Sequence, residues 1–399
     1  MANIKEIIKK IFKRLAIAGY NLGSYVIPVK ENLVLLESSN GRNYTGNPRY
    51  IYEYIVNNGL EDEFKCIWSF VNVGTEIPGN GIKVKRLRFK FLYYSLRCQF
   101  WVFDSRHHYF LRKNKKTSYI QTWHGTPLKK LALDMETVNM SGNTNIEEYK
   151  KNFRENTKSW DYLISQNSYS SEIFERAFDF KGEMLEIGYP RNDILVNGNN
   201  KENIDSIKDK LNIPKDKKII LYAPTWRDNE YFESGAYKFA SEMDFKAMYN
   251  ALADDYLMIV KFHYLVKDNI DWESYGDFII KCDQKWDIQE LYLVSDILIT
   301  DYSSVMFDYA LLERPMLFFT YDLEFYKNNL RDFYFNMEEV PGPLVKTTKG
   351  LIEEIKEIEK GNYESKYKEK YDAFIKKFNE FDDGNACKSI IELMKSNKH

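Results

Sequence analysis

Cysteine is scarce in this chain of 399 residues, and the four cysteines are scattered. They stand at Cys66, Cys98, Cys282 and Cys387, and no two of them form a CxxC pair. This scatter argues against a zinc cluster and a disulfide framework, and it fits reduced thiols in the cytosol. The chain also lacks the P-loop, GxGxxG, HExxH and GxSxG patterns, a DxD-like acidic pair in a loop, and the spacing of metal ligands.

Neither sign of charge dominates, because 57 Lys and Arg residues nearly balance 59 Asp and Glu residues and leave a net charge of −2. Without a positive field over the whole molecule, nucleic acid is not an expected partner, and any recognition of anions has to be local. Long apolar runs are missing too. The segment LAIAGYNLGSYVIP at 15–28 is interrupted by Asn21 and Ser24, is too short to span a bilayer and lacks a convincing signal-peptide cleavage site.

The N-terminal residues 4–15, IKEIIKKIFKRL, have the periodicity of an amphipathic helix. Most of the basic residues lie on one face, and the other face carries Ile4, Ile7, Ile8, Ile11, Phe12 and Leu15. A basic amphipathic helix can lie in an anionic membrane interface, and it can equally pack its apolar face on the protein's own core. The pattern alone leaves both interpretations open.

Short apolar runs of β type alternate with helical segments along the rest of the chain, which is typical of βαβ units and parallel sheets. A polar stretch, VNGNNKENIDS at 196–206, is predicted to link two such halves. From about residue 350 the pattern is helical and highly charged. We therefore predict an α/β protein with two Rossmann-like domains that face a ligand cleft. The predicted parts are an N-terminal helix and lead-in at 1–28, a first domain at 29–195, a second domain at 196–349 and C-terminal helices at 350–399.

Asn47 and Pro48 follow the first predicted strand, NLVLLES at 32–38, and a loop rich in Gly and Asn. Asparagine is a favoured N-cap, and proline suits the first turn of a helix. We therefore predict a helix that begins at Pro48 with Asn47 as its N-cap.

His124 is one of only five histidines, and it follows a β-like run in the stretch QTWHGTPLKKL at 121–131. Gly125 lets the backbone turn sharply, and the proline after Thr126 suits a helix start. His124 would then project from the carboxyl end of a strand, where an imidazole near its ordinary pKa can take a proton from a hydroxyl. The alternative is a buried histidine bonded to the backbone beside an ordinary turn.

A second strand end is the stretch APTWRD at 223–228, which follows the predicted strand IILY and contains Thr225, Arg227 and Asp228. The planar guanidinium of Arg227 suits a phosphate, because it can bond two oxygens at once. A surface ion pair with Asp228 is the competing interpretation.

The third strand end is the most informative, since DILIT at 296–300 runs into Asp301, Tyr302, Ser303 and Ser304. Backbone N–H groups at the start of the following helix can receive a phosphate, helped by the helix dipole. A plain serine N-cap without a ligand is the simpler alternative. Asp308 lies about one turn further along the helix, and its simpler interpretation is an exposed charge.

His263 ends the predicted strand IVKFH, with Lys261 two residues earlier on the same face. His107 and His108 lie in a predicted loop, and we interpret both as surface residues.

The combination of WHGTPLKK, YAPTWRD, KFH and SDILITDYSSVMFDYALLERP resembles the CDP-glycerol:poly(glycerophosphate) glycerophosphotransferase family of teichoic acid and capsule synthesis. The four stretches follow the family's order within residues 119–320, although Tyr264 stands where the family usually has a proline after the histidine. The resemblance implies a GT-B-like fold and CDP-glycerol, or a related CDP-polyol, as the donor. It further implies transfer of glycerol phosphate to a hydroxyl of a membrane-bound, lipid-linked acceptor, release of CMP, and no metal ion or other cofactor.

The resemblance also implies roles for the residues at the three strand ends. His124 would be the general base on the acceptor hydroxyl, with Gly125, Thr126 and Lys129 on the acceptor side. The catalytic His263 would help to hold the donor diphosphate, together with Arg227, Thr225, Ser303 and Ser304. The nucleotide would contact Asp308 and Asp301. Attack on a pyrophosphate needs a base on one side and positive potential on the other, and these residue types supply both.

A lipid-linked acceptor favours membrane docking of the N-terminal helix, so we expect a peripheral protein on the cytoplasmic face of the cell membrane. Only about 100 residues precede the WHG motif, which favours a single addition or a short product. The alternatives are a CDP-ribitol donor, a GT-B glycosyltransferase that uses a nucleotide sugar, and a non-catalytic membrane scaffold. The joint presence of His124, His263, Arg227 and the paired serines argues against a scaffold.

Overall fold

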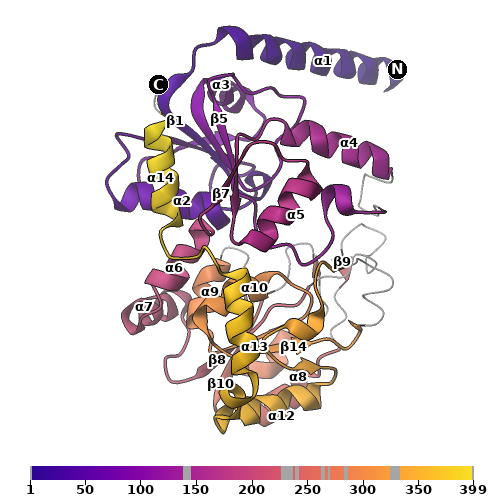
Figure 1. The fold of residues 1–399 in the computed structure, drawn as a ribbon, viewed down its shortest axis with the longest axis vertical. Coiled ribbons are helices and arrows are strands. Elements are labelled where there is room, and N and C mark those ends of the chain that lie inside the picture. Colours follow the sequence, from indigo (N-terminus) through magenta and orange to yellow (C-terminus); the bar gives the residue numbers. More distant parts are fainter. Residues whose placement is uncertain are drawn as a thin grey trace.

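The computed structural model describes residues 2–137, 145–225, 237–238, 242–261, 266–267, 270–282, 286–323 and 333–397. Within them the chain forms two α/β lobes, one above the other in Figure 1, each with its own sheet and its own buried apolar cluster. The predicted pair of Rossmann-like halves is thereby confirmed. The last strand of the first sheet ends at Glu186, and the first strand of the second sheet begins at Lys218. The predicted domain boundary at 195–196 lies between these two residues.

The first lobe contains a parallel sheet in the order β3-β2-β1-β4-β5-β6-β7. Its central strands are apolar and buried on both faces, as expected when helices cover a parallel sheet on both sides. The strands are β1 (Lys30–Glu37), β2 (Lys65–Phe70), β3 (Ile82–Lys85), β4 (Cys98–Phe103), β5 (Ser118–Gln121), β6 (Tyr162–Ser165) and β7 (Glu183–Glu186). The helices are α2 (Gly46–Asn57), α3 (Phe89–Arg97), α4 (Ile146–Thr157) and α5 (Ser168–Phe178).

The second lobe contains a parallel sheet in the order β12-β10-β8-β13-β14-β15. Its strands are β8 (Lys218–Tyr222), β10 (Tyr256–Val260), β12 (Ile279–Lys281), β13 (Ile297–Thr300), β14 (Met316–Phe319) and β15 (Leu344–Val345), and β9 (Tyr237–Lys238) pairs separately with β11 (Val266–Lys267). The helices are α8 (Phe245–Leu252), α9 (Ile288–Val294), α10 (Val305–Tyr309), α12 (Thr348–Glu359) and α13 (Asn362–Phe378).

The connection between the lobes is helical, which corrects the prediction of a polar linker at 196–206. It forms α6 (Asp193–Asn197) and α7 (Lys201–Leu211), and the side chain of Asn200 caps α7 by accepting from the backbone N–H of Asn203. Ile207 and Leu211 are buried in the second lobe's apolar cluster. The segment looked like a linker because only one narrow face of this helix is apolar.

The chain returns to the first lobe at its C-terminal end. Helix α14 (Ala386–Ser396) packs beside α2, and its Ile390, Ile391 and Met394 are buried in an apolar cluster of the first lobe (Figure 1). The predicted C-terminal helices are therefore present, but they serve both lobes.

Helix α1 (Ala2–Val26) extends away from the first lobe (Figure 1). The C-terminal part of α1 is anchored through the buried Tyr20, which packs in a small cluster with Leu96 and Leu111. No helix among the described residues is long and apolar enough to cross a membrane.

The predicted N-cap at Asn47 is wrong. Helix α2 begins two residues earlier than predicted, at Gly46, with Thr45 as its N-cap. The Asn47 side chain instead turns inward and is fully buried, where its Nδ2 donates to the backbone carbonyls of Thr122 and Trp123, each at 3.1 Å. This asparagine therefore supports the turn that carries His124.

Candidate active site

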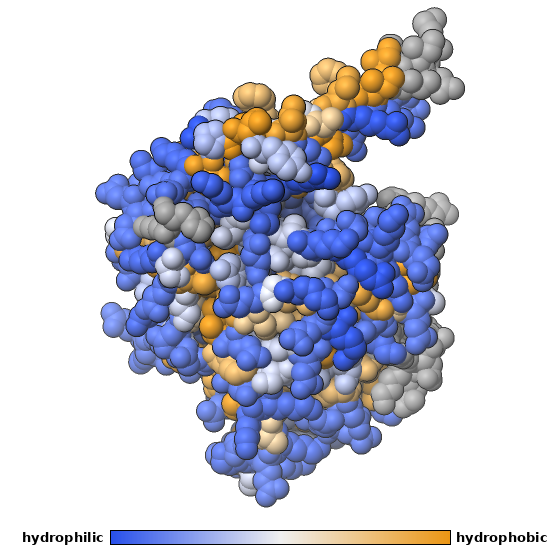
Figure 2. Space-filling model, turned by 45° about the horizontal axis from the view of Figure 1, so that its top comes forward, coloured by the Kyte–Doolittle hydropathy of each residue, from blue (hydrophilic) through white to orange (hydrophobic). Residues whose placement is uncertain are grey.

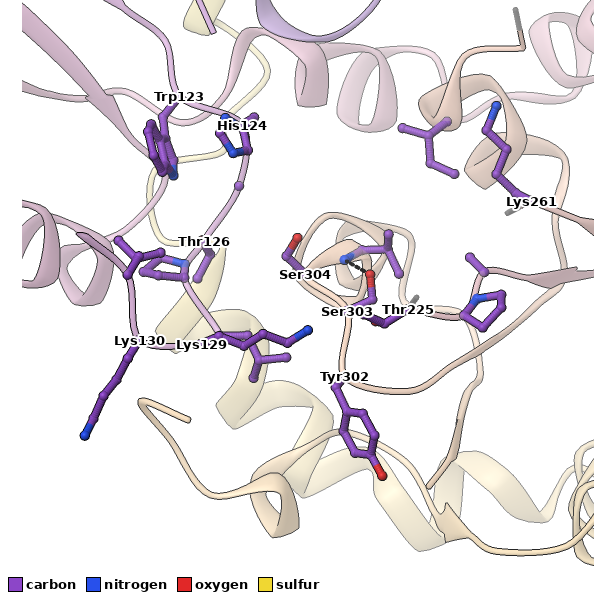
Figure 3. Close-up of a pocket in the computed structure, with 18 residues that line it drawn as sticks. Trp123, His124, Thr126, Lys129, Lys130, Thr225, Lys261, Tyr302, Ser303 and Ser304 are labelled. Atoms are coloured by element: carbon purple, nitrogen blue, oxygen red, sulfur yellow. Dashed lines mark hydrogen bonds between the residues drawn. The ribbon is translucent and has the colours of Figure 1, made fainter. Parts of the chain in front are cut away.

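A cavity of about 550 Å³ lies between the lobes, at the carboxyl ends of strands from both sheets (Figure 3). The first lobe contributes residues 123–131, which follow β5. The second lobe contributes residues 223–225 after β8, Lys261 after β10, Ile288, and residues 302–305 after β13. Four separated strand ends thus line one cavity, and they include the three that the sequence analysis singled out.

The turn that carries His124 is tightly wound. Trp123 has a φ of +50° and Gly125 a φ of +150°, both in the region that favours glycine. A Cβ atom at Gly125 would lie 3.3 Å from Ser304 Oγ and 3.5 Å from Arg191 Nη2. Gly125 is therefore needed for its backbone conformation and for the close approach of the two lobes.

The His124 ring is held on two sides. Its Nδ1 lies 2.9 Å from the backbone carbonyl of Asp104, and its ring stacks on Trp123 with centroids 4.3 Å apart. Because a carbonyl oxygen only accepts, Nδ1 carries the proton in the neutral ring, and Nε2 keeps its lone pair. This tautomer is the one that a general base at Nε2 requires.

The His124 ring is exposed on the side that faces the cavity. Protein atoms surround it on its other sides. This enclosure lowers the pKa of His124 below its ordinary value; the carbonyl and the carboxylate of Asp104 oppose the shift, and Arg191 and Arg106 add to it. Burial raises the pKa of Asp104, against the effects of His124 and of hydrogen bonds from Ser105, Ser39 and Ser38. A neutral imidazole is therefore favoured at neutral pH.

Arg191 joins the His124 turn to the second lobe. Its Nη1 donates to the carbonyl of His124 at 2.9 Å, and its Nη2 lies 2.6 Å from Asp308 Oδ2. Asp308 also accepts from Asn192 at 3.1 Å and from Gln289 at 3.4 Å.

Asp308 is buried with only 2% of its surface exposed, so the interpretation as an exposed helix charge is wrong. It does not line the cavity, and its carboxylate is engaged by the first lobe. Its contact with a nucleotide ribose stays a prediction.

Thr126 and Lys129 differ in what they face. Thr126 is buried, donates to Gln166 Oε1 at 2.7 Å and accepts from Asn167 Nδ2 at 3.0 Å. The Lys129 side chain points into the cavity in Figure 3, and its backbone forms a bridge with Phe333 of the second lobe. Thr126 therefore supports the turn, whereas Lys129 can meet a ligand.

The second-lobe wall presents hydroxyl groups. Thr225, Ser303 and Ser304 line the cavity (Figure 3). Asp301 lies behind them, buried, and its Oδ1 accepts from the backbone N–H groups of Thr225 at 2.8 Å and Tyr302 at 2.6 Å. Asp301 thus ties two strand ends together, and its predicted contact with the nucleotide stays a prediction.

Arg227, Asp228 and His263 lie outside the described residues, so their predicted roles stay predictions. Lys261, two residues before His263, lines the cavity wall and donates from Nζ to the carbonyl of Trp286 at 2.8 Å. No cluster of three or more potential metal ligands occurs in the described parts of the chain, and metal independence also stays a prediction.

The interpretation of His107 as a surface residue is wrong. His107 is only 4% exposed and packs among aromatic rings, including Trp101 and Phe103, and this burial lowers its pKa to about 3. It is a neutral core residue.

Three residues hold the turn: Asn47, for which the sequence predicted a different role, and Asp104 and Arg191, which the sequence analysis missed. Asp104 directly follows β4, and Arg191 lies in GYPRND just after β7. The rule that selected His124, a polar group just past a strand, therefore also applied to these two residues.

The sequence profile of the CDP-Glycerol:Poly(glycerophosphate) glycerophosphotransferase family matches residues 20–396. The chain is 47% identical over 393 residues to a teichoic acid poly(glycerol phosphate) polymerase of Bacillus subtilis (strain 168), covering 98% of this chain and 51% of that protein. It is 41% identical over 397 residues to a teichoic acid glycerol-phosphate transferase of Staphylococcus aureus (strain NCTC 8325 / PS 47), covering 98% and 99%. The chain thus spans about half the length of the first relative and nearly all of the second.

Among solved structures, the wall teichoic acid polymerase TagF is similar with a TM-score of 0.90 and 42% identity, covering 99% of this chain and 96% of that chain. A variant of TagF soaked with CDPG gives a TM-score of 0.90. A UDP-GlcNAc 2-epimerase from Neisseria meningitidis, at 12% identity and a TM-score of 0.52, covers 91% of this chain and 99% of that chain and shares the fold alone.

Proposed function

Because this chain belongs to the CDP-glycerol:poly(glycerophosphate) glycerophosphotransferase family, we propose that it transfers glycerol phosphate from CDP-glycerol to a hydroxyl group of a lipid-linked teichoic acid acceptor and releases CMP. The observation that carries the proposal is the shared cavity: His124, with its proton held on Nδ1, and the hydroxyls of the second lobe line the same space.

In this reaction, Nε2 of His124 takes the proton from the acceptor hydroxyl as its oxygen attacks the β-phosphorus of CDP-glycerol. The bond between that phosphorus and the bridging oxygen breaks, and the bridging oxygen leaves with CMP. Hydrogen bonds from Thr225, Ser303 and Ser304 would stabilise the charge that builds on the phosphate oxygens. Lys129 and Lys261 add positive charge to the cavity wall.

The test is mass spectrometry of the products from CDP-glycerol or CDP-ribitol with a synthetic lipid-linked acceptor. We expect CMP and an acceptor heavier by one or more glycerol phosphate units. The number of added units separates single addition from polymerisation, and transfer from CDP-ribitol alone would contradict the glycerol assignment. UDP-sugars serve as the control for the glycosyltransferase alternative, which release of UDP would favour.

We further propose that α1 docks the protein on an anionic membrane, at the cytoplasmic face where the lipid-linked acceptor is held. The apolar side chains of Ile8, Ile11, Phe12 and Leu15 are 52–74% exposed, and Figure 2 shows the apolar surface along this helix. Burying each side chain in the interface would contribute up to about 1.5–3 kcal/mol. Each basic residue of the opposite face adds about 1 kcal/mol near anionic lipid.

Co-sedimentation with vesicles that contain anionic lipid tests this docking. Phe12→Asp should reduce the bound fraction strongly while activity on a water-soluble acceptor is retained. Val71→Asp is a matched control, because Val71 is 53% exposed on the body of the first lobe. Equal binding of both variants would contradict docking through α1.

A further inference from the structure

Arg106, which lies near the chain segment that holds His124, has no carboxylate partner among the described residues. Arg106 stands two residues after Asp104, whose backbone carbonyl holds the His124 ring. Within the parts of the chain that the structure describes, the Arg106 guanidinium makes no ion pair and no hydrogen bond, unlike Arg191, which is committed to Asp308 and the His124 carbonyl. Its donors are therefore available to an anion from outside the protein.

Aromatic rings hold the Arg106 side chain in place. Its guanidinium carbon lies 4.5 Å from the ring centroid of Phe153 and 5.5 Å from that of Tyr149, both on α4. A guanidinium packed on aromatic rings keeps the N–H groups at its edge free for hydrogen bonds. The arrangement thus presents a planar, half-buried cation whose geometry suits two oxygens of one phosphate.

The position of Arg106 indicates which substrate it meets. Arg106 is not part of the cavity wall, which includes the second-lobe hydroxyls proposed to hold the donor. It belongs to the first lobe and follows closely after Asp104, whose backbone carbonyl lies 2.9 Å from His124 Nδ1. A chain end of glycerol phosphate carries its reactive hydroxyl only a few bonds from a phosphodiester, so an acceptor hydroxyl at His124 brings an anion close to this side of the ring.

We propose that Arg106 binds the phosphate nearest to the acceptor's chain end and so presents the terminal hydroxyl to His124. The inference rests on the proposed function and adds a phosphodiester subsite on the acceptor side. It assigns recognition of the acceptor charge to the first lobe and recognition of the donor diphosphate to the second.

The experiment compares two synthetic acceptors, one ending in glycerol phosphate and one ending in uncharged glycerol on the same lipid. A charge-assisted pair of about 1.5–3 kcal/mol predicts that Arg106→Met raises KM for the charged acceptor roughly 10- to 100-fold. KM for CDP-glycerol and for the uncharged acceptor should hardly change. Methionine keeps an apolar contact with Phe153, and Arg106→Lys, which keeps the charge without the planar fork, should fall between Arg106→Met and the wild type.

Arg154→Met is the matched control, since it removes the same charge from an exposed site on α4. An equal effect of Arg106→Met and Arg154→Met, or an equal loss with both acceptors, would overturn the phosphate subsite while leaving the proposed function intact. Failure of the wild type to release CMP from CDP-glycerol with either acceptor would overturn both.

Discussion

The two walls of the cavity are built differently. On the first-lobe side, the backbone carbonyls of residues 122–124 accept from Asn47 and Arg191, and the His124 ring is bonded to Asp104. On the second-lobe side, the hydrogen bond to Ser303 Oγ among the described residues is a long one of 3.5 Å from the backbone N–H of Val305. Ser304 makes no side-chain cap bond there, although it stands at the N-cap of α10. The His124 turn is therefore held by hydrogen bonds within the protein, whereas the two serines of the other wall keep hydrogen-bonding capacity for a ligand.

This difference matches the demands of the proposed reaction. A base must be held in one tautomer and one orientation, so its surroundings are fixed before any substrate binds. Groups that hold a diphosphate stabilise it most when they have no hydrogen-bond partner in the protein that competes with the ligand. Substitutions on the first-lobe side should therefore change turnover or stability, and those on the second-lobe side should change donor binding.

The largest effect is expected for His124→Ala. Loss of a general base lowers kcat roughly 10²- to 10⁴-fold, while binding of CDP-glycerol should be nearly unchanged because the imidazole acts on the acceptor. Product formation and calorimetric titration with CDP-glycerol measure the two quantities. Near-normal turnover would contradict the assignment of the base.

The wild-type pH profile sharpens this test. The base must be neutral, so kcat/KM should fall as pH drops through the pKa of His124. The protein atoms around the ring hold that pKa below its ordinary value, and the acid limb should therefore lie at a lower pH than for a histidine surrounded by water.

Arg191→Gln should produce the largest loss of stability. It leaves the buried Asp308 carboxylate without its cation, which typically costs about 3–5 kcal/mol of unfolding free energy. Urea unfolding measures it. Arg176→Gln is the control, because Arg176 pairs with Asp134 at the surface with 58% of its side chain exposed, and its loss should cost less than about 1 kcal/mol. Similar losses for both variants would contradict the role of the buried pair.

Asp382→Asn should make stability less dependent on pH. Asp382 accepts from Gln166 at 2.6 Å and from the backbone N–H of Tyr189 at 3.0 Å. It supports the His124 turn indirectly, because Gln166 in turn accepts from Thr126 at 2.7 Å. Burial raises the pKa of Asp382 to about 7.

The raised pKa means that the fold favours the protonated carboxyl. The protonated Asp382 carboxyl contributes fully to stability when the pH is below the ordinary aspartate pKa of about 4. This contribution is lost as the pH rises through about 7. Unfolding free energies between pH 5 and pH 8 should therefore fall more for the wild type than for Asp382→Asn. Parallel pH curves for the two proteins would contradict this sign.

Ser304→Ala should have the smallest effect. The hydroxyl faces the cavity, so its removal costs one hydrogen bond to the donor, about 0.5–1.5 kcal/mol, or roughly a 2- to 10-fold rise in KM for CDP-glycerol. Unfolding free energy should not change, because Ser304 makes no side-chain cap bond. A loss of stability without a change in KM would show that Ser304 belongs to the fixed wall.

Sequence reasoning located the cavity because parallel strands end at the same edge of a sheet. His124, Thr225 and Ser303 each follow a predicted strand, and all three line one space. It misassigned Asn47, whose partners at residues 122 and 123 lie some 75 positions away. Sequence reasoning also left open that Asp308 is an exposed charge. Its buried partner, Arg191, lies 117 positions earlier, and the sequence does not reveal this pairing.

The sequence by itself determined the two parallel-sheet halves, the strand ends that carry polar groups and the amphipathic character of α1, since each follows from local periodicity and residue type. Only the tertiary structure decided which of these groups face the cavity and which are consumed in holding it. Burial and hydrogen bonding depend on contacts between residues far apart in the chain. The same aspartate or asparagine can therefore be a ligand or a support according to what packs against it.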